Sequence, residues 1–347
     1  MNPWVTFILI ASLGLGTTIT FASSHWLLAW MGLEINTLAI IPLMAQHYHP
    51  RAVEATTKYF LTQAAAAALM LFAATSNAWT LGEWGIQQLT HPLTATMVMI
   101  SLAMKVGLAP THLWLPEVLQ GLDLTTGLVL STWQKLAPMT LIYQLAHNVD
   151  PTILTMIGLT STLVGGWGGL NQTQLRKVLA YSSIAHMGWM IIILKYSPNL
   201  MMLNLLVYIL MTSTAFLTLK LVSSTTINAL ATTWSKAPTV VTVAMLTMLS
   251  LAGLPPLTGF MPKWMVLQEL ANQDLPTTAT IMALSALLSL FFYLRLCYSM
   301  ILTYGPNTTN NKAPWRLKTT TISPLPTLAT ASLVMLPLTP AAIALLT

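Results

Sequence analysis

The sequence predicts an all-α protein that crosses a membrane eleven times. Of its 347 residues, 55% are hydrophobic and only 6% are charged, whereas a soluble domain carries roughly a quarter of its residues as charges. The apolar residues fall into stretches of about 20, the length that a helix needs to cross the hydrocarbon core. These observations exclude a soluble enzyme, and the single cysteine, Cys297, excludes a disulfide scaffold.

The first half of the chain holds five of the expected spans. The first begins at Pro3 and lacks the basic segment and cleavage site of a signal peptide, so we expect it to be retained. The fourth is interrupted by the segment 107–110, of sequence Gly-Leu-Ala-Pro, and again by Pro116, so it is either one broken span or two short ones. The five spans cover residues 3–22, 25–45, 57–78, 93–121 and 124–146.

Six further spans follow in the second half. The second interrupted span resembles the first, because the sequence Gly-Leu-Pro-Pro at 253–256 and Pro262 break it. The last span opens with Ser323 and Pro324 and has two more prolines near its far end. The six spans cover residues 152–171, 175–194, 199–222, 238–271, 276–303 and 323–345.

The basic residues predict the orientation of the chain. If each interrupted segment crosses once, nine of the 14 basic residues lie in loops on one face and only Lys195 lies on the other. The positive-inside rule then places the N-terminus on the matrix or cytoplasmic side. The nine are Arg51, Lys58, Arg176, Lys177, Lys220, Lys236, Lys312, Arg316 and Lys318.

The two interrupted segments resemble each other. Both read Gly-Leu-x-Pro, followed by a second proline and an apolar turn that ends in Leu-Gln, and they lie 146 residues apart. The second copy lies five spans after the first, and an odd offset inverts it, as in many secondary transporters. We therefore expect inverted five-helix repeats in residues 1–147 and 148–305, followed by a matrix loop and a C-terminal helix in 306–347. A chance match is the alternative, because Gly and Pro are common in membrane helices.

Four charged residues fall inside the spans: Glu34, Lys105, Lys135 and Lys263. A lysine at the bilayer centre costs roughly 2.5–3.5 kcal/mol on insertion scales, so these groups must face an interior that hydrates or pairs them. Burial disfavours a charged lysine and a nearby carboxylate favours it, so moving that carboxylate would move a proton. Glu34 and Lys105 are the expected pair, and the other two lysines would be relay stations beyond it.

Two histidines lie on the same route. His112 follows the first interruption, and His186 lies in the middle of the span 175–194. Imidazole titrates near neutrality and can pass a proton between its two nitrogens. The alternative is structural: each histidine is buried with a static partner, and the lysines snorkel or form fixed pairs that set helix packing.

The chain shows no pattern for a redox centre, metal site or nucleotide site of its own. A bis-histidine haem needs axial pairs that face each other across helices, and no predicted span holds two well-spaced internal histidines. One cysteine cannot hold an iron–sulfur cluster, and neither G-x-G-x-x-G nor a P-loop is present. We therefore expect no catalytic residue, no cofactor and no nucleic-acid partner for this chain.

Four segments resemble the antiporter-like membrane subunits of respiratory complex I, NADH:ubiquinone oxidoreductase, which are similar to subunits of multisubunit cation/proton antiporters. They are residues 1–3, 30–36 around Glu34, 103–110 around Lys105, and 182–188 around His186. The resemblance covers essentially the whole chain and implies a proton-translocating subunit of the membrane arm. It implies a hydrated axis through Glu34, Lys105, His112, Lys135, His186 and Lys263.

The resemblance also implies where this subunit works and with what. NADH, FMN, the iron–sulfur clusters and ubiquinone would act elsewhere in the complex, and the N-terminus would lie in the matrix at the mitochondrial inner membrane. The expected partners are other membrane-arm subunits, including antiporter-like neighbours, and phospholipids such as cardiolipin. Two alternatives stay open: a structural scaffold with static ion pairs, and an independent cation/proton antiporter.

Overall fold

The computed structural model of the chain describes residues 2–46, 49–89, 91–235, 237–302 and 324–346. Within these ranges the regular structure is helical, apart from two isolated bridges, so the all-α prediction is confirmed. The predicted matrix loop with Lys312, Arg316 and Lys318 lies outside the described residues, as does Lys236. The chain divides into two compact units, Met1–Ser161 and Thr162–Thr347, which are described separately.

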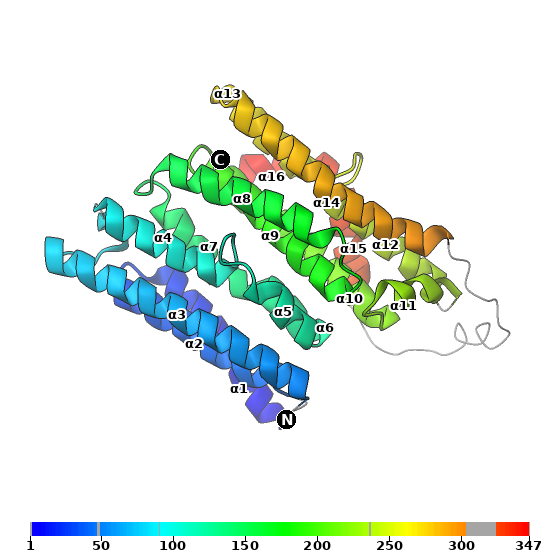
Figure 1. Cartoon of the computed structure of the whole chain (residues 1–347), viewed down its shortest axis with the longest axis horizontal. Helices are drawn as coiled ribbons and strands as arrows, with labels where there is room; N and C mark the ends of the chain where they lie inside the picture. The colour runs from blue at the N-terminus through cyan, green and yellow to red at the C-terminus, as the bar shows by residue number, and fades with distance from the viewer. Residues whose placement is uncertain (1, 47–48, 90, 236, 303–323, 347) are drawn as a thin grey trace. The chain divides into compact units, whose positions relative to one another are not determined.

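In the first unit, long helices pack side by side, with α1 against α2 and α3 against α4 (Figure 1). Glycines allow the close approach of α1 and α2: a Cβ on Gly16 would lie 2.8 Å from the backbone oxygen of Gly32. Three helices begin with proline, which suits the first turn because its missing N–H would have no partner there. The helices are α1 (Pro3–Ala22), α2 (Trp26–Met44), α3 (Pro50–Leu81), η1 (Ile86–Gln88), α4 (Pro92–Val106), α5 (Trp114–Gly121), α6 (Leu124–Ser131) and α7 (Trp133–Leu145).

The helix α8 (Pro151–Gly169) contributes residues to both units. In the second unit α10 packs against α12 and α15, and α12 packs against α14. The other helices are α9 (Leu175–Ile193), α10 (Pro198–Val222), α11 (Ile227–Ala231), η2 (Thr232–Ser235), α12 (Pro238–Ala252), α13 (Phe260–Asn272), α14 (Pro276–Leu302), α15 (Leu325–Val334), η5 (Leu336–Leu338) and α16 (Thr339–Leu346).

Both predicted interruptions occur at the expected glycines. The helix α4 ends at Gly107, with φ +86°, and α12 ends at Gly253, with φ +80°. This left-handed conformation favours glycine and ends a helix. A cis X-Pro peptide bond follows each glycine, at Ala109-Pro110 and Pro255-Pro256. The chain resumes as α5 and α13, so each interrupted segment contains two helices.

Two other expected spans are also interrupted, which the sequence analysis did not predict. The stretch 124–146 breaks at Thr132, whose backbone departs from helical geometry, with φ −113° and ψ −68°. The stretch 323–345 forms α15, η5 and α16 in place of one helix. Pro337 has no N–H to donate to the preceding turn, so α15 ends at Val334.

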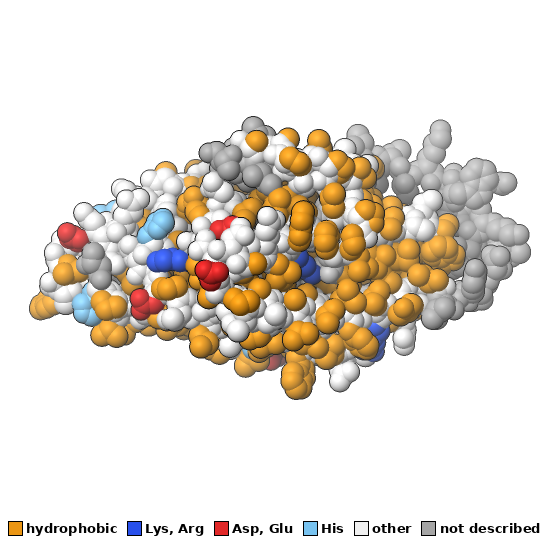
Figure 2. Space-filling view, turned by 90° about the horizontal axis from the view of Figure 1, so that it is seen from above, with side chains coloured by type: hydrophobic (Ala, Val, Ile, Leu, Met, Phe, Trp, Pro, Cys, Tyr) orange, Lys and Arg blue, Asp and Glu red, His pale blue; other side chains and the backbone are white. Residues whose placement is uncertain are grey.

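Five described helices are long and apolar enough to cross a membrane: α1, α2, α3, α10 and the segment Pro276–Ile301 of α14. Large apolar side chains remain exposed, including Trp79 at 92% and Trp167 at 76%. Figure 2 shows hydrophobic side chains over much of the visible surface, with few charged groups among them. Contiguous apolar surface of this kind suits contact with lipid.

Candidate functional site: buried charges in two units

In the first unit Glu34 of α2 pairs with Lys105 of α4. The Lys105 Nζ lies 3.7 Å from the Glu34 Oε1, and the two side chains are 2% and 24% exposed, respectively. This separation is an ion pair but is longer than a direct hydrogen bond. The lysine occupies the last turn of α4, where the partial negative charge of the helix end favours a cation.

The break after α4 is held in place by two side-chain contacts. The indole Nε1 of Trp114, the first residue of α5, donates to the Met104 carbonyl at 3.1 Å. The backbone N–H of Ala109 donates to the Ser161 hydroxyl at 3.1 Å. Because the turn beside Lys105 is anchored on both sides, the position of that lysine is defined by α5 and α8 as well as by α4.

Lys135 reaches the same place from α7. It is buried, at 3% exposure, and it lies in the first turn after the break at Thr132. Lys105 and Lys135 line one cavity of about 20 Å³ between α2, α3, α4 and α7. A cavity of this size is large enough for one water molecule. The structure thus brings together two of the three predicted lysines.

His112 lies in the connection between α4 and α5 and is buried at 8% exposure. Its Nδ1 lies 3.2 Å from the carbonyl oxygen of Pro110. It does not line the cavity shared by the two lysines.

In the second unit His186 of α9 and Lys263 of α13 line one small pocket, together with Ser182, Ser289 and Tyr293. The Lys263 Nζ donates to the carbonyl of Ala252 at 2.8 Å, and this carbonyl is at the end of α12. A Cβ on Gly253 would lie 2.8 Å from the Lys263 Cδ, so the glycine leaves room for the lysine chain. Lys263 thus caps the first half of the broken segment.

The sequence analysis missed three amide side chains at the first cavity: Asn36, Gln63 and Gln134. Asn36 and Gln63 are 2% and 3% exposed. Gln134 Nε2 donates to the backbone carbonyl of Asn36 at 3.2 Å and links α7 to α2 beside Lys135. Their signal in the sequence was a polar amide well inside an apolar span, which is costly unless it has a partner.

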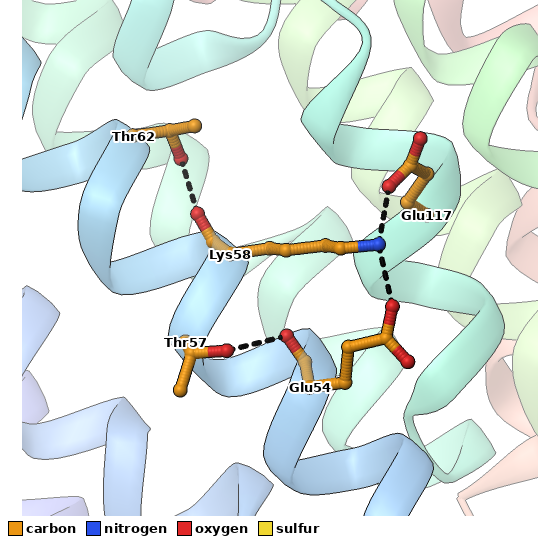
Figure 3. A network of polar contacts seen from close by, with 5 residues as sticks. All are labelled: Glu54, Thr57, Lys58, Thr62 and Glu117. Carbon is orange, nitrogen blue, oxygen red and sulfur yellow. Dashed lines mark hydrogen bonds and ion pairs between the residues drawn. The ribbon is translucent and has the colours of Figure 1, made fainter.

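Lys58 forms a second charged cluster, away from the cavity (Figure 3). Its Nζ lies 2.7 Å from the Glu54 Oε1 and 2.7 Å from the Glu117 Oε2. The three side chains are between 42% and 63% exposed. The cluster joins α3 to α5 at the surface. It contains a single cation between two carboxylates.

The described residues contain no group of three or more His, Cys, Asp or Glu side chains that could hold a metal ion. The groups that the structure assembles are instead proton carriers: amines, an imidazole and a carboxylate. Within the described first unit, two of the amines, Lys105 and Lys135, line a cavity that is too small for an organic cofactor. The arrangement suits transfer of protons between side chains.

The family described as "NADH:quinone oxidoreductase/Mrp antiporter, TM" matches residues 23–289 of the chain. The family described as "NADH dehydrogenase subunit 2 C-terminus" matches residues 290–343. A similar curated protein is NADH-ubiquinone oxidoreductase chain 2 of Carassius auratus, which is 68% identical over all of both chains. The sequence similarity therefore extends over both compact units.

Solved structures share the fold. A chain of respiratory complex I from Thermus thermophilus superposes with a TM-score of 0.86 at 26% identity, covering 100% of this chain and 81% of that one. A chain of the Mrp complex from Dietzia superposes with a TM-score of 0.82 at 14% identity, covering 97% of this chain and 76% of that one. At 14% identity the second match concerns the fold alone.

Proposed function

Because the chain belongs to the family of NADH-ubiquinone oxidoreductase chain 2, we propose that its buried charges carry the protons moved through this subunit. The chain is a proton-translocating membrane-arm subunit of respiratory complex I, the NADH:ubiquinone reductase, and it is a multi-pass membrane protein. The residues proposed for proton transfer are Glu34, Lys105, His112, Lys135, His186 and Lys263.

One observation carries the proposal: Lys105 and Lys135 line a single cavity, and Lys105 has a carboxylate partner on another helix. When Glu34 is close, it favours the charged form of Lys105. When Glu34 moves away, the buried ammonium loses that support and releases a proton toward Lys135. Lys135 is the proposed acceptor because it lines the same cavity, from α7.

The second unit would use His186 and Lys263 in the same way. Both residues line one pocket, which is too small to hold a water molecule, so transfer between them would require the pocket to open. In this structure Lys263 donates to the Ala252 carbonyl, so it must exchange that bond for another partner during transfer. His112, in the connection between α4 and α5, would join the route only if the region around the Pro110 carbonyl becomes hydrated.

The larger organisation that we propose follows the charge and repeat patterns. It has eleven spans with two inverted five-helix repeats, and an N-terminus in the matrix at the mitochondrial inner membrane. Antiporter-like subunits and phospholipids such as cardiolipin would be its neighbours. NADH, FMN, iron–sulfur clusters and ubiquinone would act in other parts of the complex, and this chain would supply no redox site.

A scaffold function is the second candidate, and specific contacts favour it. The Lys263 hydrogen bond and the Lys58 cluster are the static pairings expected of a structural subunit. An independent cation/proton antiporter is a third candidate, favoured by the likeness in fold to a chain of the Mrp complex. Such an antiporter would transport ions when reconstituted alone.

The test is Lys135→Met in the assembled complex, because methionine keeps the length of the side chain and removes the proton carrier. We expect fewer protons pumped per NADH oxidised, measured in vesicles by a pH-sensitive dye. Lys135→Arg keeps the charge but does not release its proton, so it should assemble normally and pump equally poorly.

The matched control is Lys220→Met, which removes an exposed lysine outside the proposed path. This control should pump normally. Unchanged pumping by both Lys135 variants in fully assembled complex would reject the relay and favour the scaffold.

A further inference from the structure

A cleft runs between α10 and the C-terminal helices α15 and α16 in the second unit. Its volume is about 210 Å³, whereas the cavity beside Lys105 in the first unit has about 20 Å³. Folded proteins contain few empty spaces larger than a water molecule. A space of this size among packed helices therefore indicates an occupant other than the described residues of the chain.

The cleft is elongated, because it follows one face of α10. Its wall on this helix has the spacing i, i+3, i+4, i+7 and i+8, which places the side chains in one row along a helix. At a rise of 1.5 Å per residue the row is about 12 Å long. A long, narrow space suits an extended chain better than a compact molecule. The residues of the row are Leu203, Leu206, Val207, Leu210 and Met211.

The cleft opens at the surface of the second unit and ends in its core. At its mouth the side chains of Leu206, Met335 and Leu338 are 55%, 37% and 57% exposed. At its floor Met211 and Ser332 are each 1% exposed. An occupant would therefore enter sideways between α10 and the C-terminal helices, and its end would be buried.

The lining of the cleft is apolar. None of the described residues that line it is charged. Two buried hydroxyl residues in the lining have partners within the protein: the Thr258 hydroxyl donates to the Ser332 carbonyl, and the Ser332 hydroxyl donates to the Ala329 carbonyl at 3.0 Å. A cavity of roughly 150 Å³ with an apolar lining stays dry and takes up an apolar ligand. The occupant expected here is therefore a hydrocarbon.

The depth of the row on α10 identifies the source of that hydrocarbon. The helix has 25 residues and is about 37 Å long, and the hydrocarbon core of a bilayer is about 30 Å thick. With α10 centred in the bilayer, the row begins about 4 Å inside the core and ends close to its centre, at Met211. A lipid acyl chain covers the same depth, because it runs from the headgroup layer to the middle of the bilayer.

We propose that this cleft binds one acyl chain of a membrane phospholipid, with the end of the chain between Met211 and Ser332. The headgroup would stay at the membrane surface, because a charged group is costly at the depth of the cleft. The proposal gives the phospholipid neighbours named under the proposed function a defined site. It does not depend on the proton relay.

A bound chain would also support the second interrupted segment. Thr258 and Met261, which line the cleft, belong to the connection after α12 and to the start of α13. The Ser250 hydroxyl of α12 donates to the Ser332 carbonyl of α15 at 3.1 Å. The acyl chain would therefore contact α15 and both sides of the turn that precedes Lys263.

The experiment is photolabelling of the assembled complex in phosphatidylcholine vesicles. The vesicles contain a phosphatidylcholine with a diazirine at the end of one acyl chain, and mass spectrometry locates the labelled residues. We expect label on Met211 at least as strong as label on Leu206, because the chain end lies at the floor of the cleft. A phosphatidylcholine with the diazirine beside the headgroup should label Met211 about tenfold less, because the headgroup stays at the surface.

The variant that closes the site is Ala331→Phe, because Ala331 lines the cleft and a cavity of roughly 150 Å³ is already filled by a benzene ring. Label on Met211 should fall about fivefold in this variant. Ala331→Leu adds a smaller side chain and should give a smaller fall. The matched control is Ala283→Phe, which places the same ring on an exposed position of α14 away from the cleft. It should leave the label on Met211 unchanged.

Label on Leu206 without label on Met211 would mean that lipid touches only the surface of the cleft, and would overturn the proposal. Equal labelling of Met211 in the unaltered protein and in assembled Ala331→Phe would do the same. A side chain of another subunit that occupies the cleft in a cryo-EM map of the complex would replace the acyl chain by a protein contact. Proton pumping by the Lys135 variants is a separate measurement, so the relay can fail while the lipid site is supported.

Discussion

Gly253 shows how one backbone conformation positions a buried charge. Its φ of +80° turns the chain at the end of α12, and its missing side chain leaves the space in which the aliphatic part of Lys263 lies. The Nζ of Lys263 then donates to the carbonyl of Ala252, the last residue of α12. A cation is favourable there because the C-terminal end of a helix carries partial negative charge. The position of Lys263 therefore depends on a residue that itself carries no charge.

At this scale we predict that Gly253→Ala destabilises the chain and displaces Lys263. The left-handed backbone alone costs roughly 1–2 kcal/mol for a residue with a Cβ, and the new methyl group would also contact Lys263 Cδ at 2.8 Å. The measurement is the temperature at which the assembled complex loses this subunit on heating, which should fall.

Gly82→Ala is the matched control for that prediction. Gly82 also has a positive φ, +75°, but a Cβ there would meet nothing within 4 Å. It should show the backbone effect without the clash, and proton pumping should stay normal. Equal losses of stability and of pumping in both variants would contradict the role assigned to the space at Gly253.

At the scale of elements, α5 is attached to α3 along its length. Lys58 bonds to Glu117 at 2.7 Å, and a Cβ on Gly121 would lie 2.7 Å from the Arg51 carbonyl oxygen. At the start of α5 the Trp114 ring meets Tyr59 edge to face, with the centroids 5.7 Å apart. The Trp114 indole also donates to the carbonyl of Met104, next to Lys105. The helix α3 is therefore connected through α5 to the end of α4 at the break.

For this pair of helices we predict that Lys58→Met weakens the attachment of α5 slightly, and more at low salt than at high salt. Exposed ion pairs contribute little and are screened by salt, but the variant leaves Glu54 and Glu117 without their shared cation. The measurement is the rate of proteolysis after Gln120 in detergent-solubilised complex at two salt concentrations.

Glu54→Gln is the control, because it keeps the Lys58–Glu117 bond that joins the two helices. It should change proteolysis less than Lys58→Met does. An effect of Lys58→Met on proteolysis that is large and independent of salt would contradict an attachment by exposed ion pairs.

At the scale of the whole molecule, a membrane-impermeant maleimide can show which side of the membrane each loop faces, because it reacts only with cysteines exposed on the side where it is added. The single native cysteine, Cys297, is buried at 3% exposure and should not react. We predict that Thr173→Cys, between α8 and α9, reacts only from the matrix side. Asn272→Cys, at the end of α13, should react only from the opposite side. Mitoplasts expose the side opposite the matrix to the reagent, and inside-out vesicles expose the matrix side.

Labelling of both cysteines from one side would contradict single crossing by the interrupted segments. If each segment crossed the membrane twice, the loop at Thr173 would change sides, and the second segment would then restore the side of Asn272. The distribution of basic residues among the loops argues against this result, because double crossing would place basic residues on both faces of the membrane.

The elements that depend on local chemistry could be predicted from the sequence. The expected spans 3–22 and 276–303 agree with α1 and α14, and both interruptions fall at the glycines proposed for them. The break at Thr132 could not be predicted, because no glycine or proline stands at that position in the sequence. The sequence also provided no reason to group Asn36, Gln63 and Gln134, which lie on three separate helices and line one cavity in the structure.

The residues alone were enough to predict a helical membrane protein with two spans broken at Gly107 and Gly253 and with lysines inside its apolar stretches. These properties follow from residue type and spacing, because length, hydropathy and backbone freedom act within each segment. In the folded chain Lys105 and Lys135 share a cavity with Asn36 and Gln63, while Lys263 caps α12. Those contacts depend on how separate helices pack, which no single segment encodes.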